Sequence, residues 1–338
     1  MKKLGINGFG RIGRNTLRAA IKYGIWDKIE IVAVNDPGMT PELAAYLFEN
    51  DTVMGTFEGD VEAGNNGIKI NGKSIKLLSE KDPASLPWKD IGVEIILECS
   101  GFFTDANKAK GHIDAGAKKV LISAPAKNED ITINLGVNPE MYDPVKHNII
   151  SMASCTTNCL SVVAKTLNDN FGIVKSLITT THAYTSTQKI LDAPDPRHVR
   201  RGRAAAANIV PTTTGASKAT ELVLPELKGK LDAMALRVPV VDASIIDMVA
   251  LTEKPLTVEL VNAAFKEAAE GKLKSIMSYT EKELVSSDYI GSPYSAIFDA
   301  KLTKVLGDNM VKLFAWYDNE MGYSTRLAEC ALFIARKL

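Results

Sequence analysis

One cysteine of this chain lies where thiol chemistry is favoured. Cys155 stands in Ser154-Cys155-Thr156-Thr157, where a polar stretch turns into a helix, and its hydroxyl neighbours are typical of a helix N-cap. A thiol at a helix start meets the positive end of the helix dipole and N–H groups that lack helical partners. Both favour the thiolate, so we expect Cys155 to be a nucleophile.

A histidine able to act as the base follows later in the chain. His182 closes a β-branched run in ITTTHAYTSTQ, and the end of a strand can present a side chain to a cleft. Beside a cysteine at a helix start, a histidine could activate the thiol and later act as acid or base. His112, His147 and His198 have no such partner in view, and we expect them at the surface.

The remaining cysteines fit a structural role. A small buried cysteine is a common fate of this residue type, and Cys99, Cys159 and Cys330 each stand in an apolar strand or helix. The four cysteines are too scattered to indicate a disulfide framework, and no two histidines stand at ligand spacing. We therefore expect a reducing compartment and no metal site.

A glycine loop near the N-terminus is typical of dinucleotide binding. Residues 8–13, GFGRIG, follow one predicted strand and open a predicted helix. In such a loop Gly8 makes the tight turn, Gly10 lets the backbone approach a pyrophosphate, and Gly13 allows close helix–strand packing. N–H groups at the helix start would hold the phosphates. The candidate cofactor-binding residues of this loop are Gly8, Phe9, Gly10, Arg11, Ile12 and Gly13.

An acidic residue selects between the two nicotinamide cofactors. Asp36 ends the next predicted strand, IEIVAVND, and its carboxylate can accept hydrogen bonds from a ribose 2′-OH. The same charge would repel a 2′-phosphate, so we expect NAD rather than NADP. The alternative is that the glycines only shape a turn and that Asp36 caps the following element.

The predicted elements change in character near residue 152. Before it, continuous apolar runs at 3–8, 29–36, 93–101 and 118–125 alternate with helices, which predicts a doubly wound parallel sheet of the Rossmann type. After it, helices and longer, partly alternating strands predict a mostly antiparallel sheet with helices on one face. The strand candidates of this second part are 176–184, 234–254, 295–300 and 311–318.

This change predicts two domains. We expect a dinucleotide-binding domain over 1–152 and a catalytic domain over 153–319. A C-terminal helix at about 320–338 is expected to pack back on the first domain.

Composition excludes several classes of protein. The 338 residues carry 40 basic and 40 acidic side chains, so the overall charge favours neither nucleic acid nor an anionic membrane. No apolar run is long enough to span a bilayer, and the N-terminus lacks the apolar core of a signal peptide. We expect a cytoplasmic enzyme.

Six segments of the chain resemble the phosphorylating glyceraldehyde-3-phosphate dehydrogenase family. NGFGRIGR, ASCTTNC, HAYTSTQ, RAAAANIVPTTTGASKA, LRVP and WYDNEMGYS occur in the family's order and spacing, and the resemblance runs from residue 3 to 338. It implies that Cys155 attacks the aldehyde to give a thiohemiacetal, with His182 as base. Hydride transfer to NAD then leaves a thioester, which inorganic phosphate cleaves. It also implies a role in glycolysis or gluconeogenesis and a homotetramer with neither a membrane nor a dedicated nucleic-acid site.

The resemblance assigns binding residues as well. Thr185 and Arg237 match the site for the substrate phosphate. Asn319 matches the residue that orients the nicotinamide carboxamide, and Tyr323 matches one that flanks the ring. Positions matching the inorganic-phosphate site, with Arg201 near it, are Ser154, Thr156, Thr214 and Gly215. Positions at the edge of the cofactor are Ser100 and Ser123.

Two departures from the family adjoin the site. Met321 stands where NE-x-GYS usually has an aromatic residue, and the segment after Arg237 reads VPVVDASIID where the family more often has VPTPNVSVVD. Neither departure removes a catalytic group. In residues 191–195, LDAPD, Pro194 resembles NAD-using members, while Ala193 leaves dual use of NAD and NADP open.

Two other functions fit parts of this pattern. An enzyme that oxidises erythrose 4-phosphate shares the cysteine, the histidine and the fold, but intact Thr214 and Gly215 favour the phosphorylating reaction. An NAD-binding regulator or RNA-binding protein would not need the complete catalytic set. The basic run 197–203 lacks interleaved aromatic residues for base stacking. It fits better as a solvated or subunit-facing loop, in which Arg201 could contribute to anion binding.

Overall fold

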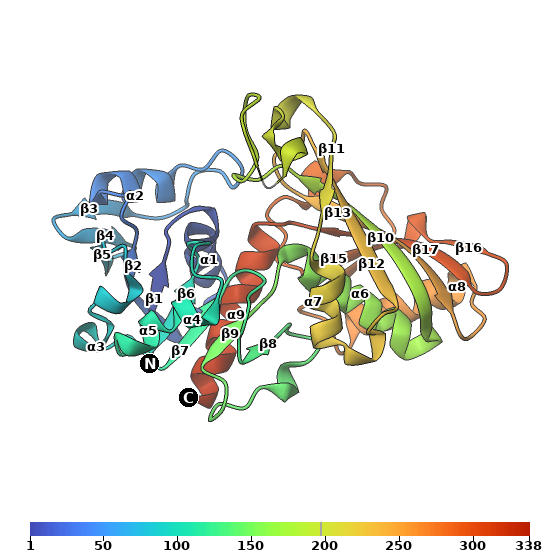
Figure 1. The fold of residues 1–338 in the computed structure, drawn as a ribbon, viewed down its shortest axis with the longest axis horizontal. Coiled ribbons are helices and arrows are strands. Elements are labelled where there is room, and N and C mark those ends of the chain that lie inside the picture. The colour runs from blue at the N-terminus through green and yellow to red at the C-terminus, as the bar shows by residue number, and fades with distance from the viewer. Residues whose placement is uncertain (197) are drawn as a thin grey trace. The chain divides into compact units, whose positions relative to one another are not determined.

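The computed structural model describes residues 1–196 and 198–338, which form two compact units (Figure 1). The first unit contains residues 1–133, 140–153 and 324–338, and the second contains residues 134–139 and 154–323. Arg197, part of the predicted basic run, lies outside the described residues. Each unit is built on its own sheet, as predicted.

The sheet of the first unit is mostly parallel. Its strand order is β3-β4-β5-β2-β1-β6-β7-β9-β8, and all pairs from β5 to β8 are parallel. The predicted parallel sheet is thus confirmed, with β3 and β4 as an antiparallel edge that the sequence patterns did not predict. The strands are β1 (Lys2–Asn7), β2 (Ile29–Asn35), β3 (Val61–Gly64), β4 (Gly67–Ile70), β5 (Lys73–Leu78), β6 (Ile95–Glu98), β7 (Lys119–Ile122), β8 (Ile131–Thr132) and β9 (Ile149–Ser151).

The order of these strands fixes where a ligand can enter. In the sheet, β1 lies between β2 and β6, so the strand order reverses direction at β1. At such a point the connections on the two sides of β1 lead away from each other, and a crevice opens at the carboxyl ends of the strands. Asn7 is the register partner of both Asn35 and Glu98, so three polar residues end three adjacent strands at one level. The helices of this unit are α1 (Arg11–Lys22), α2 (Pro41–Glu49), α3 (Trp88–Ile91), α4 (Ala106–Ala109), α5 (Gly111–Asp114) and most of α9 (Met321–Lys337).

The sheet of the second unit is mostly antiparallel, as predicted. Its order is β11-β12-β10-β13-β17-β15-β14, with β16 paired to β17, and only the pairs β10–β12 and β14–β15 are parallel. The strands are β10 (Ile173–Ala183), β11 (Val210–Thr213), β12 (Leu231–Val238), β13 (Ser244–Thr252), β14 (Met277–Thr280), β15 (Ala296–Asp299), β16 (Lys304–Leu306) and β17 (Met310–Tyr317).

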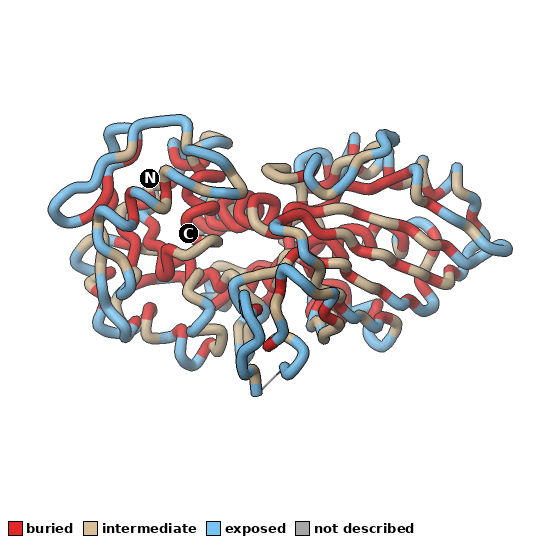
Figure 2. The backbone as a smooth tube through the Cα atoms, turned by 90° about the horizontal axis from the view of Figure 1, so that it is seen from above, coloured by how far each residue is buried: buried red, intermediate tan, exposed pale blue. Residues whose placement is uncertain are grey.

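Three helices cover one face of this sheet. α6 (Cys155–Phe171), α7 (Ala216–Val223) and α8 (Val258–Glu270) contact its strands. Ile246 and Met248 of β13 share one apolar core with Leu160 and Leu167 of α6. Buried and less buried residues alternate along β13, because only one of its faces meets the helices; Figure 2 shows this banding along the strands.

The predicted strand over 234–254 is wrong in one respect. The structure divides it into β12 and β13, because residues 239–243 form a turn that crosses the end of β10, the strand between them. Pro239 opens this turn, and Ala243 closes it with a φ of +65°. Among the described residues, no helix combines the length and the apolar character needed to span a bilayer.

Candidate active site

The candidate nucleophile opens a helix, as predicted. α6 begins at Cys155, and Ser154 is its N-cap, because the Ser154 hydroxyl accepts a hydrogen bond from the Thr157 N–H at 3.1 Å. The N–H of Thr156 is directed at the sulfur of Cys155. The hydroxyl-rich motif therefore places the thiol among helix-start donors.

His182 lies beside this thiol. It is the next-to-last residue of β10 and only 3% exposed, and its Nε2 atom lies 3.5 Å from Cys155 Sγ. Its Nδ1 atom lies 2.7 Å from the carbonyl oxygen of Ala183. Nδ1 also lies within hydrogen-bond distance of Arg237, which can only donate, so the partner of Nδ1 depends on the tautomer. In the tautomer whose Nδ1–H donates to the Ala183 carbonyl, Nε2 is the bare acceptor that a base for the thiol needs.

A guanidinium completes the cluster. Arg237 on β12 is the register partner of His182 on the adjacent parallel strand β10. Its Nη1 lies 2.9 Å from the Ala183 carbonyl oxygen and 2.7 Å from His182 Nδ1. Because parallel strands present their carboxyl ends at the same edge, the sheet brings base and cation together there. The cysteine, histidine and arginine named from the sequence thus meet within the second unit.

Burial sets the protonation states of this cluster. It raises the pKa of the Cys155 thiol to about 11, although Arg237 and the hydroxyl and N–H of Thr156 act in the opposite direction. Burial and then the charge of Arg237 lower the pKa of His182 to about 3. The donors around the sulfur favour the thiolate, as the helix start predicts, but desolvation outweighs them. The resting pair is a neutral thiol and a neutral imidazole.

Tyr317 ties the cluster to the last long strand, although the sequence patterns did not single it out. Its hydroxyl lies 2.9 Å from Thr156 Oγ1 and 2.8 Å from Thr180 Oγ1, and its ring packs edge-on against His182 at 5.9 Å between centroids. The Thr156 side chain, at 4% exposure, is thus bonded inwards. The only sequence signal for Tyr317 was its place in WYDNEMGYS.

Asn319 is oriented by a second residue that the sequence did not reveal. The Ala183 N–H donates to Ser244 Oγ at 3.1 Å, and the Ser244 hydroxyl donates to Asn319 Oδ1 at 2.6 Å. With its oxygen bonded to Ser244, Asn319 can offer its amide nitrogen to a carbonyl acceptor. Tyr323, the other predicted nicotinamide contact, is a buried residue in the first turn of α9.

Hydroxyl groups lie at two strand ends of the second unit. Thr185 follows β10, and its Oγ1 lies 2.9 Å from Thr187 Oγ1. Thr214 follows β11, and its hydroxyl accepts a hydrogen bond at 3.2 Å from the N–H of Ala216, the first residue of α7. Gly215 is the N-cap of that helix. Hydroxyls and helix-start N–H groups suit phosphate oxygens.

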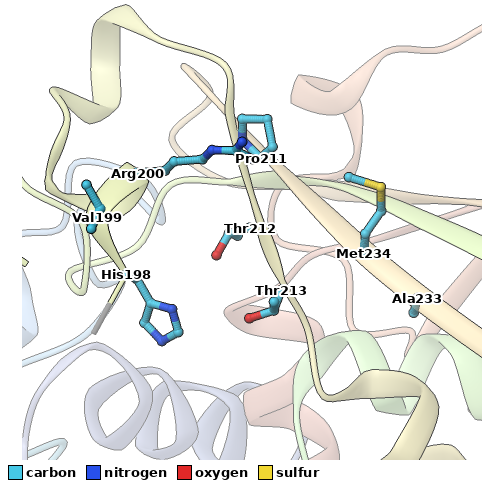
Figure 3. Close-up of a pocket in the computed structure, with 8 residues that line it drawn as sticks. All are labelled: His198, Val199, Arg200, Pro211, Thr212, Thr213, Ala233 and Met234. Atoms are coloured by element: carbon cyan, nitrogen blue, oxygen red, sulfur yellow. The ribbon is translucent and has the colours of Figure 1, made fainter. Parts of the chain in front are cut away.

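Arg201 lies against the strand that leads to Thr214. It stands in a 3-10 turn at 199–202, and it donates to Thr212 Oγ1 at 2.8 Å and to the Thr213 carbonyl at 3.2 Å. Figure 3 shows the adjoining pocket, about 420 Å³ in volume, between residues 198–200 and strands β11 and β12. Its lining includes neither Cys155 nor His182, so this pocket is separate from the catalytic cluster.

The glycine loop of the first unit has the geometry that the sequence predicted. Gly8 follows β1 with a φ of +91°, and a Cβ there would lie 2.5 Å from the Ser100 backbone. A Cβ on Gly13 would lie 2.2 Å from the Gly8 carbonyl oxygen, so the close approach of α1 requires glycine. A Cβ on Gly10 would meet no described atom within 4 Å, so the backbone there is open to a ligand.

The other loop residues have partners within the unit. Asp36 Oδ2 accepts from the Phe9 N–H at 2.9 Å, and Asp36 Oδ1 accepts from the Gly38 N–H at 3.0 Å. This carboxylate therefore lies against the glycine loop, where a ribose would be met. Arg11 forms a 2.6 Å ion pair with Asp51, and the Phe9 side chain is buried.

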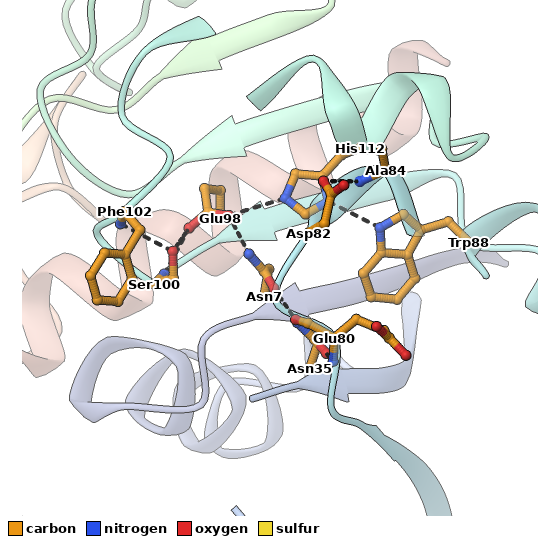
Figure 4. A network of polar contacts seen from close by, with 10 residues as sticks. All are labelled: Asn7, Asn35, Glu80, Asp82, Ala84, Trp88, Glu98, Ser100, Phe102 and His112. Carbon is orange, nitrogen blue, oxygen red and sulfur yellow. Dashed lines mark hydrogen bonds and ion pairs between the residues drawn. The ribbon is translucent and has the colours of Figure 1, made fainter. Parts of the chain in front are cut away.

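Beneath the loop, a buried carboxylate joins neighbouring strands. Glu98 accepts hydrogen bonds from Asn7 Nδ2 at 2.5 Å, from the Ser100 N–H at 2.8 Å and from the Ser100 hydroxyl at 2.5 Å. Asn7 Oδ1 in turn accepts from Asn35 Nδ2 at 2.7 Å. Figure 4 shows this chain of polar side chains. Ser100, a predicted cofactor contact, is held in place by Glu98.

His112 belongs to the same network, which corrects its expected place at the surface. It is fully buried, Trp88 Nε1 lies 3.0 Å from its Nδ1, and its Nε2 lies 3.0 Å from Glu98 Oε2. An indole N–H can only donate, so Nδ1 accepts and Nε2–H donates to Glu98. His112 is therefore a further donor to this carboxylate.

The other three cysteines lack the surroundings of Cys155. Cys159 and Cys330 are buried, and burial raises the pKa of Cys330 and of Cys99 to about 12. The Cys99 thiol interacts with Ser123, which follows β7. Across the described part of the chain, no group of three or more His, Cys, Asp or Glu residues could hold a metal ion.

Two family profiles and several curated proteins match this chain. The NAD binding domain of glyceraldehyde 3-phosphate dehydrogenase matches residues 2–106, and the C-terminal domain matches residues 154–319. Glyceraldehyde-3-phosphate dehydrogenase 2 of Streptomyces avermitilis is 54% identical over 336 residues, 99% of each chain. The enzyme of Geobacillus stearothermophilus is 55% identical over 335 residues, 99% of this chain and 98% of that protein. The chain belongs to the glyceraldehyde-3-phosphate dehydrogenase family.

Membership of this family bears out the resemblance seen in the sequence. The NAD-binding profile covers the glycine loop, Asp36 and Glu98, and the C-terminal profile begins at Ser154, one residue before Cys155. NAD is thus confirmed as the expected cofactor, and the expected class, an NAD-dependent oxidoreductase, is confirmed with it.

Proposed function

We propose that this protein oxidises D-glyceraldehyde 3-phosphate to 1,3-bisphosphoglycerate with NAD and inorganic phosphate, in glycolysis or gluconeogenesis. One observation carries the proposal: in a member of this family, the Cys155 thiol opens α6 with His182 Nε2 3.5 Å from its sulfur. A helix-start thiol with a buried base in contact is built for covalent attack on a carbonyl.

Cys155 and His182 perform the covalent steps. As Sγ attacks the aldehyde carbon, His182 Nε2 takes the thiol proton and returns it to the new alkoxide, which gives a thiohemiacetal. His182 then takes the hydroxyl proton as the carbon loses hydride, which leaves a thioester on Cys155. An oxygen of inorganic phosphate attacks the thioester carbonyl, and Cys155 departs as thiolate. Because thiol and imidazole are both neutral at rest, proton transfer accompanies the attack.

Positive charge and hydroxyl groups bind the two phosphates. Arg237 and Thr185 are proposed to hold the substrate phosphate, because Arg237 lies beside the base and Thr185 follows the same strand. The residues proposed to hold inorganic phosphate are Ser154, Thr156, Arg201, Thr214 and Gly215.

The residues of the glycine loop fit NAD, because Gly10 is open and Asp36 lies against the loop. When bound, NAD supplies the acceptor for the hydride. The chain's own part is to hold the cofactor through the N–H groups of the loop, a carboxylate for the ribose and an amide for the carboxamide. The residues proposed to bind it are Gly8, Phe9, Gly10, Arg11, Ile12, Gly13, Asp36, Ser100, Ser123, Asn319 and Tyr323.

We further propose a cytoplasmic homotetramer. Exposed apolar side chains, such as Leu177 at 69% on β10 and Ile190 at 86% in the loop after it, suit contacts between subunits. Light scattering should give four times the 36.6 kDa chain mass; a monomer would contradict the proposal. In domain terms, residues 1–152 would bind the dinucleotide and residues 153–319 would bind substrate, with the final helix belonging to the first domain.

The proposed reaction is tested by measuring NADH formation with and without phosphate. We expect Cys155→Ser to lower kcat by roughly 10³-fold or more. The matched control is Cys159→Ala one helical turn on, a buried cysteine without a base, which should retain most activity. Without phosphate, mass spectrometry should find an acyl group on Cys155. Rapid turnover without phosphate, or a preference for erythrose 4-phosphate, would contradict the phosphorylating assignment.

A further inference from the structure

Two carboxyl groups are buried together beside Asn319. Asp242 lies in the turn 239–243, Asp318 directly follows β17, and the two are 0% and 1% exposed. Their contact follows from the sheet: Ser244 of β13 pairs with Tyr317 of the antiparallel β17, so the residues just before β13 meet those just after β17. The two side chains are close enough to interact.

Asp318 is surrounded by donors. Its Oδ2 accepts from the Gly291 N–H at 2.6 Å, and its Oδ1 accepts from the N–H groups of Glu320 at 2.8 Å and Met321 at 2.7 Å. Met321 is the first residue of α9, so this carboxylate also meets the positive end of a helix. Burial raises the pKa of Asp318, and the three N–H donors and the contact with Asp242 act in the opposite direction.

Asp242 has a different environment. Its Oδ1 accepts from the Ala243 N–H at 2.8 Å, but no described donor reaches its Oδ2. The acceptor groups of Asp318 are nearby instead, and two anionic oxygens cannot satisfy each other. Burial and then the carboxylates of Asp318 and Glu320 raise the pKa of Asp242 to about 9. A proton on Asp242 turns the contact into a hydrogen bond.

We propose that Asp242 is a protonated positioning residue: its carboxylic acid donates to Asp318 and locks the 239–243 turn against the segment that carries Asn319. This inference rests on the proposed oxidation by NAD, because Asn319 is the residue assigned to the nicotinamide carboxamide. Asp242 lies in the segment where the chain departs from the family sequence, which more often has asparagine at this position. An asparagine amide can donate the same hydrogen bond without a titratable proton.

The locked turn touches several parts of the site. Ala243 has a φ of +65°, a strained value for a residue with a Cβ. The next residue, Ser244, donates to Asn319, and the Val240 carbonyl accepts from the Tyr184 N–H at 3.1 Å, just after His182 and Ala183. The hydrogen bond from Asp242 therefore holds a strained turn that connects the base strand to the amide of Asn319.

The protonation of Asp242 also affects the nucleophile. The groups within electrostatic reach of Asp242 are Asp318 and Glu320 after β17 and Cys155 at the start of α6. A negative charge on Asp242 raises the pKa of Cys155, against the effect of Arg237. While the acid is protonated, the pair carries one negative charge; above about pH 9 it carries two, which repel each other within the turn.

The sign of the pH effect follows from this. The pKa of Asp242 in the folded chain lies above its value in the unfolded chain, so folding favours the protonated acid. This contribution is fully present below the unfolded value near pH 4, falls as the pH rises, and levels off above about pH 9. In Asp242→Asn this dependence should be absent.

The test compares Asp242→Asn, Asp242→Ala and wild type between pH 6 and pH 10. For the wild type we expect the KM for NAD to rise about tenfold from pH 8 to pH 10. At pH 10 only about a tenth of the molecules still carry the proton on Asp242, and only these bind NAD well. For Asp242→Asn this ratio should stay within about twofold. Asp242→Ala, which can donate no hydrogen bond, should show a raised KM at every pH. The control is Asp308→Asn, an exposed aspartate of the same unit, which should follow the wild-type profile.

Two readouts separate this inference from the proposed function. Infrared spectra at pH 7 should show a protonated carboxylic acid band in the wild type that is lost in Asp242→Asn, whatever the substrate. In thermal unfolding, the stability of Asp242→Asn relative to the wild type should increase as the pH rises from 5 to 9. If the carboxylic acid band is unchanged in Asp242→Asn, or if the KM ratios of the two proteins are equal, the inference is overturned. Absence of dehydrogenase activity with an intact band would overturn only the proposed function.

Discussion

Glu98 in the first unit and Asp242 in the second are both buried carboxyl groups beside predicted cofactor contacts, yet they differ in their hydrogen-bond donors. Glu98 accepts from Asn7, His112 and both donors of Ser100. Asp242 has one N–H donor and faces another carboxylate. Buried carboxyl groups of similar exposure can therefore differ widely in how well their oxygens are satisfied by donors.

The two sites also differ in what supplies the donors. Side chains from β1, α5 and the loop after β6 surround Glu98, so its donors are carried by several packed elements. Backbone N–H groups of two loops surround Asp318, and the turn of Asp242 contributes only one more. We therefore expect the stability of the Glu98 site to change mainly on mutation, and that of the Asp242–Asp318 pair to change with pH as well.

The largest effect is expected at Glu98. Glu98→Gln replaces one acceptor oxygen by an NH2 group, which can only donate. The buried donors that faced this oxygen therefore lose their acceptor. The expected loss of stability is about 3 kcal/mol. Urea unfolding followed by circular dichroism measures it, with Glu80→Gln, an exposed glutamate near the same network, as the matched control. A loss below about 0.5 kcal/mol, the range of ordinary surface changes, would show that the hydrogen bonds to Glu98 do not stabilise the fold.

The next effect separates the two members of the acid pair. Asp318→Asn removes an anion from the start of α9 and leaves one N–H, such as that of Gly291, without an acceptor. We expect a loss of about 2 kcal/mol in urea unfolding at pH 7. Asp242→Asn should instead be neutral or stabilising there. Opposite signs for two isosteric changes in one contact would place the proton on Asp242, and equal signs would contradict that assignment.

A smaller effect is expected at His112. His112→Phe leaves the Trp88 N–H without an acceptor and removes one donor from Glu98, at a cost of about 1–2 kcal/mol. His112→Gln can accept from Trp88 and donate to Glu98, so it should recover part of the loss. The measurement is the shift in urea midpoint for the two variants. Equal losses would mean that packing of the ring, rather than its hydrogen bonds, stabilises the site.

The smallest effect is expected at Ser244. Ser244→Ala removes the donor to Asn319 but leaves both acids in place. We expect the KM for NAD to rise by about threefold to tenfold, equivalent to one hydrogen bond, with the alkaline rise of the wild type preserved. Steady-state kinetics at pH 7.5 and pH 10 would show both. Loss of the alkaline rise in this variant would mean that the pH effect does not originate in the acid pair.

Local patterns were sufficient to predict that Cys155 begins a helix and that residues 8–13 form a glycine loop between a strand and a helix. Cys155 could be recognised because an N-cap serine and the start of a helix stand next to it in the sequence. The glycine loop could be recognised because the spacing of its glycines is that of a tight backbone turn. Both are short-range features that need no knowledge of distant packing. The same holds for the two sheet types, since alternation and continuous apolar runs report how many faces of a strand are buried.

The errors arose where long-range packing decides. His112 was expected at the surface because its partner Trp88 is remote in the sequence and the pattern gives no sign of their contact. The break between β12 and β13 was missed because β-branched residues continue through the turn that crosses β10. The desolvation of Cys155 could not be predicted because it depends on the whole fold, whereas the helix start is visible in the sequence. The acid pair depends on the register of β13 and β17.

The hydroxyl of Tyr317 has a consequence for the synthesis of the protein. It joins Thr156 across 161 residues of chain, so the last long strand must be in place before the surroundings of the nucleophile are complete. While the chain is still being made, Cys155 can be present on its helix without the tyrosine, the strand partners of His182 or the amide of Asn319. Catalytic competence should therefore arise only after β17 and Asn319 have been made, and a chain that stops before β17 should be inactive.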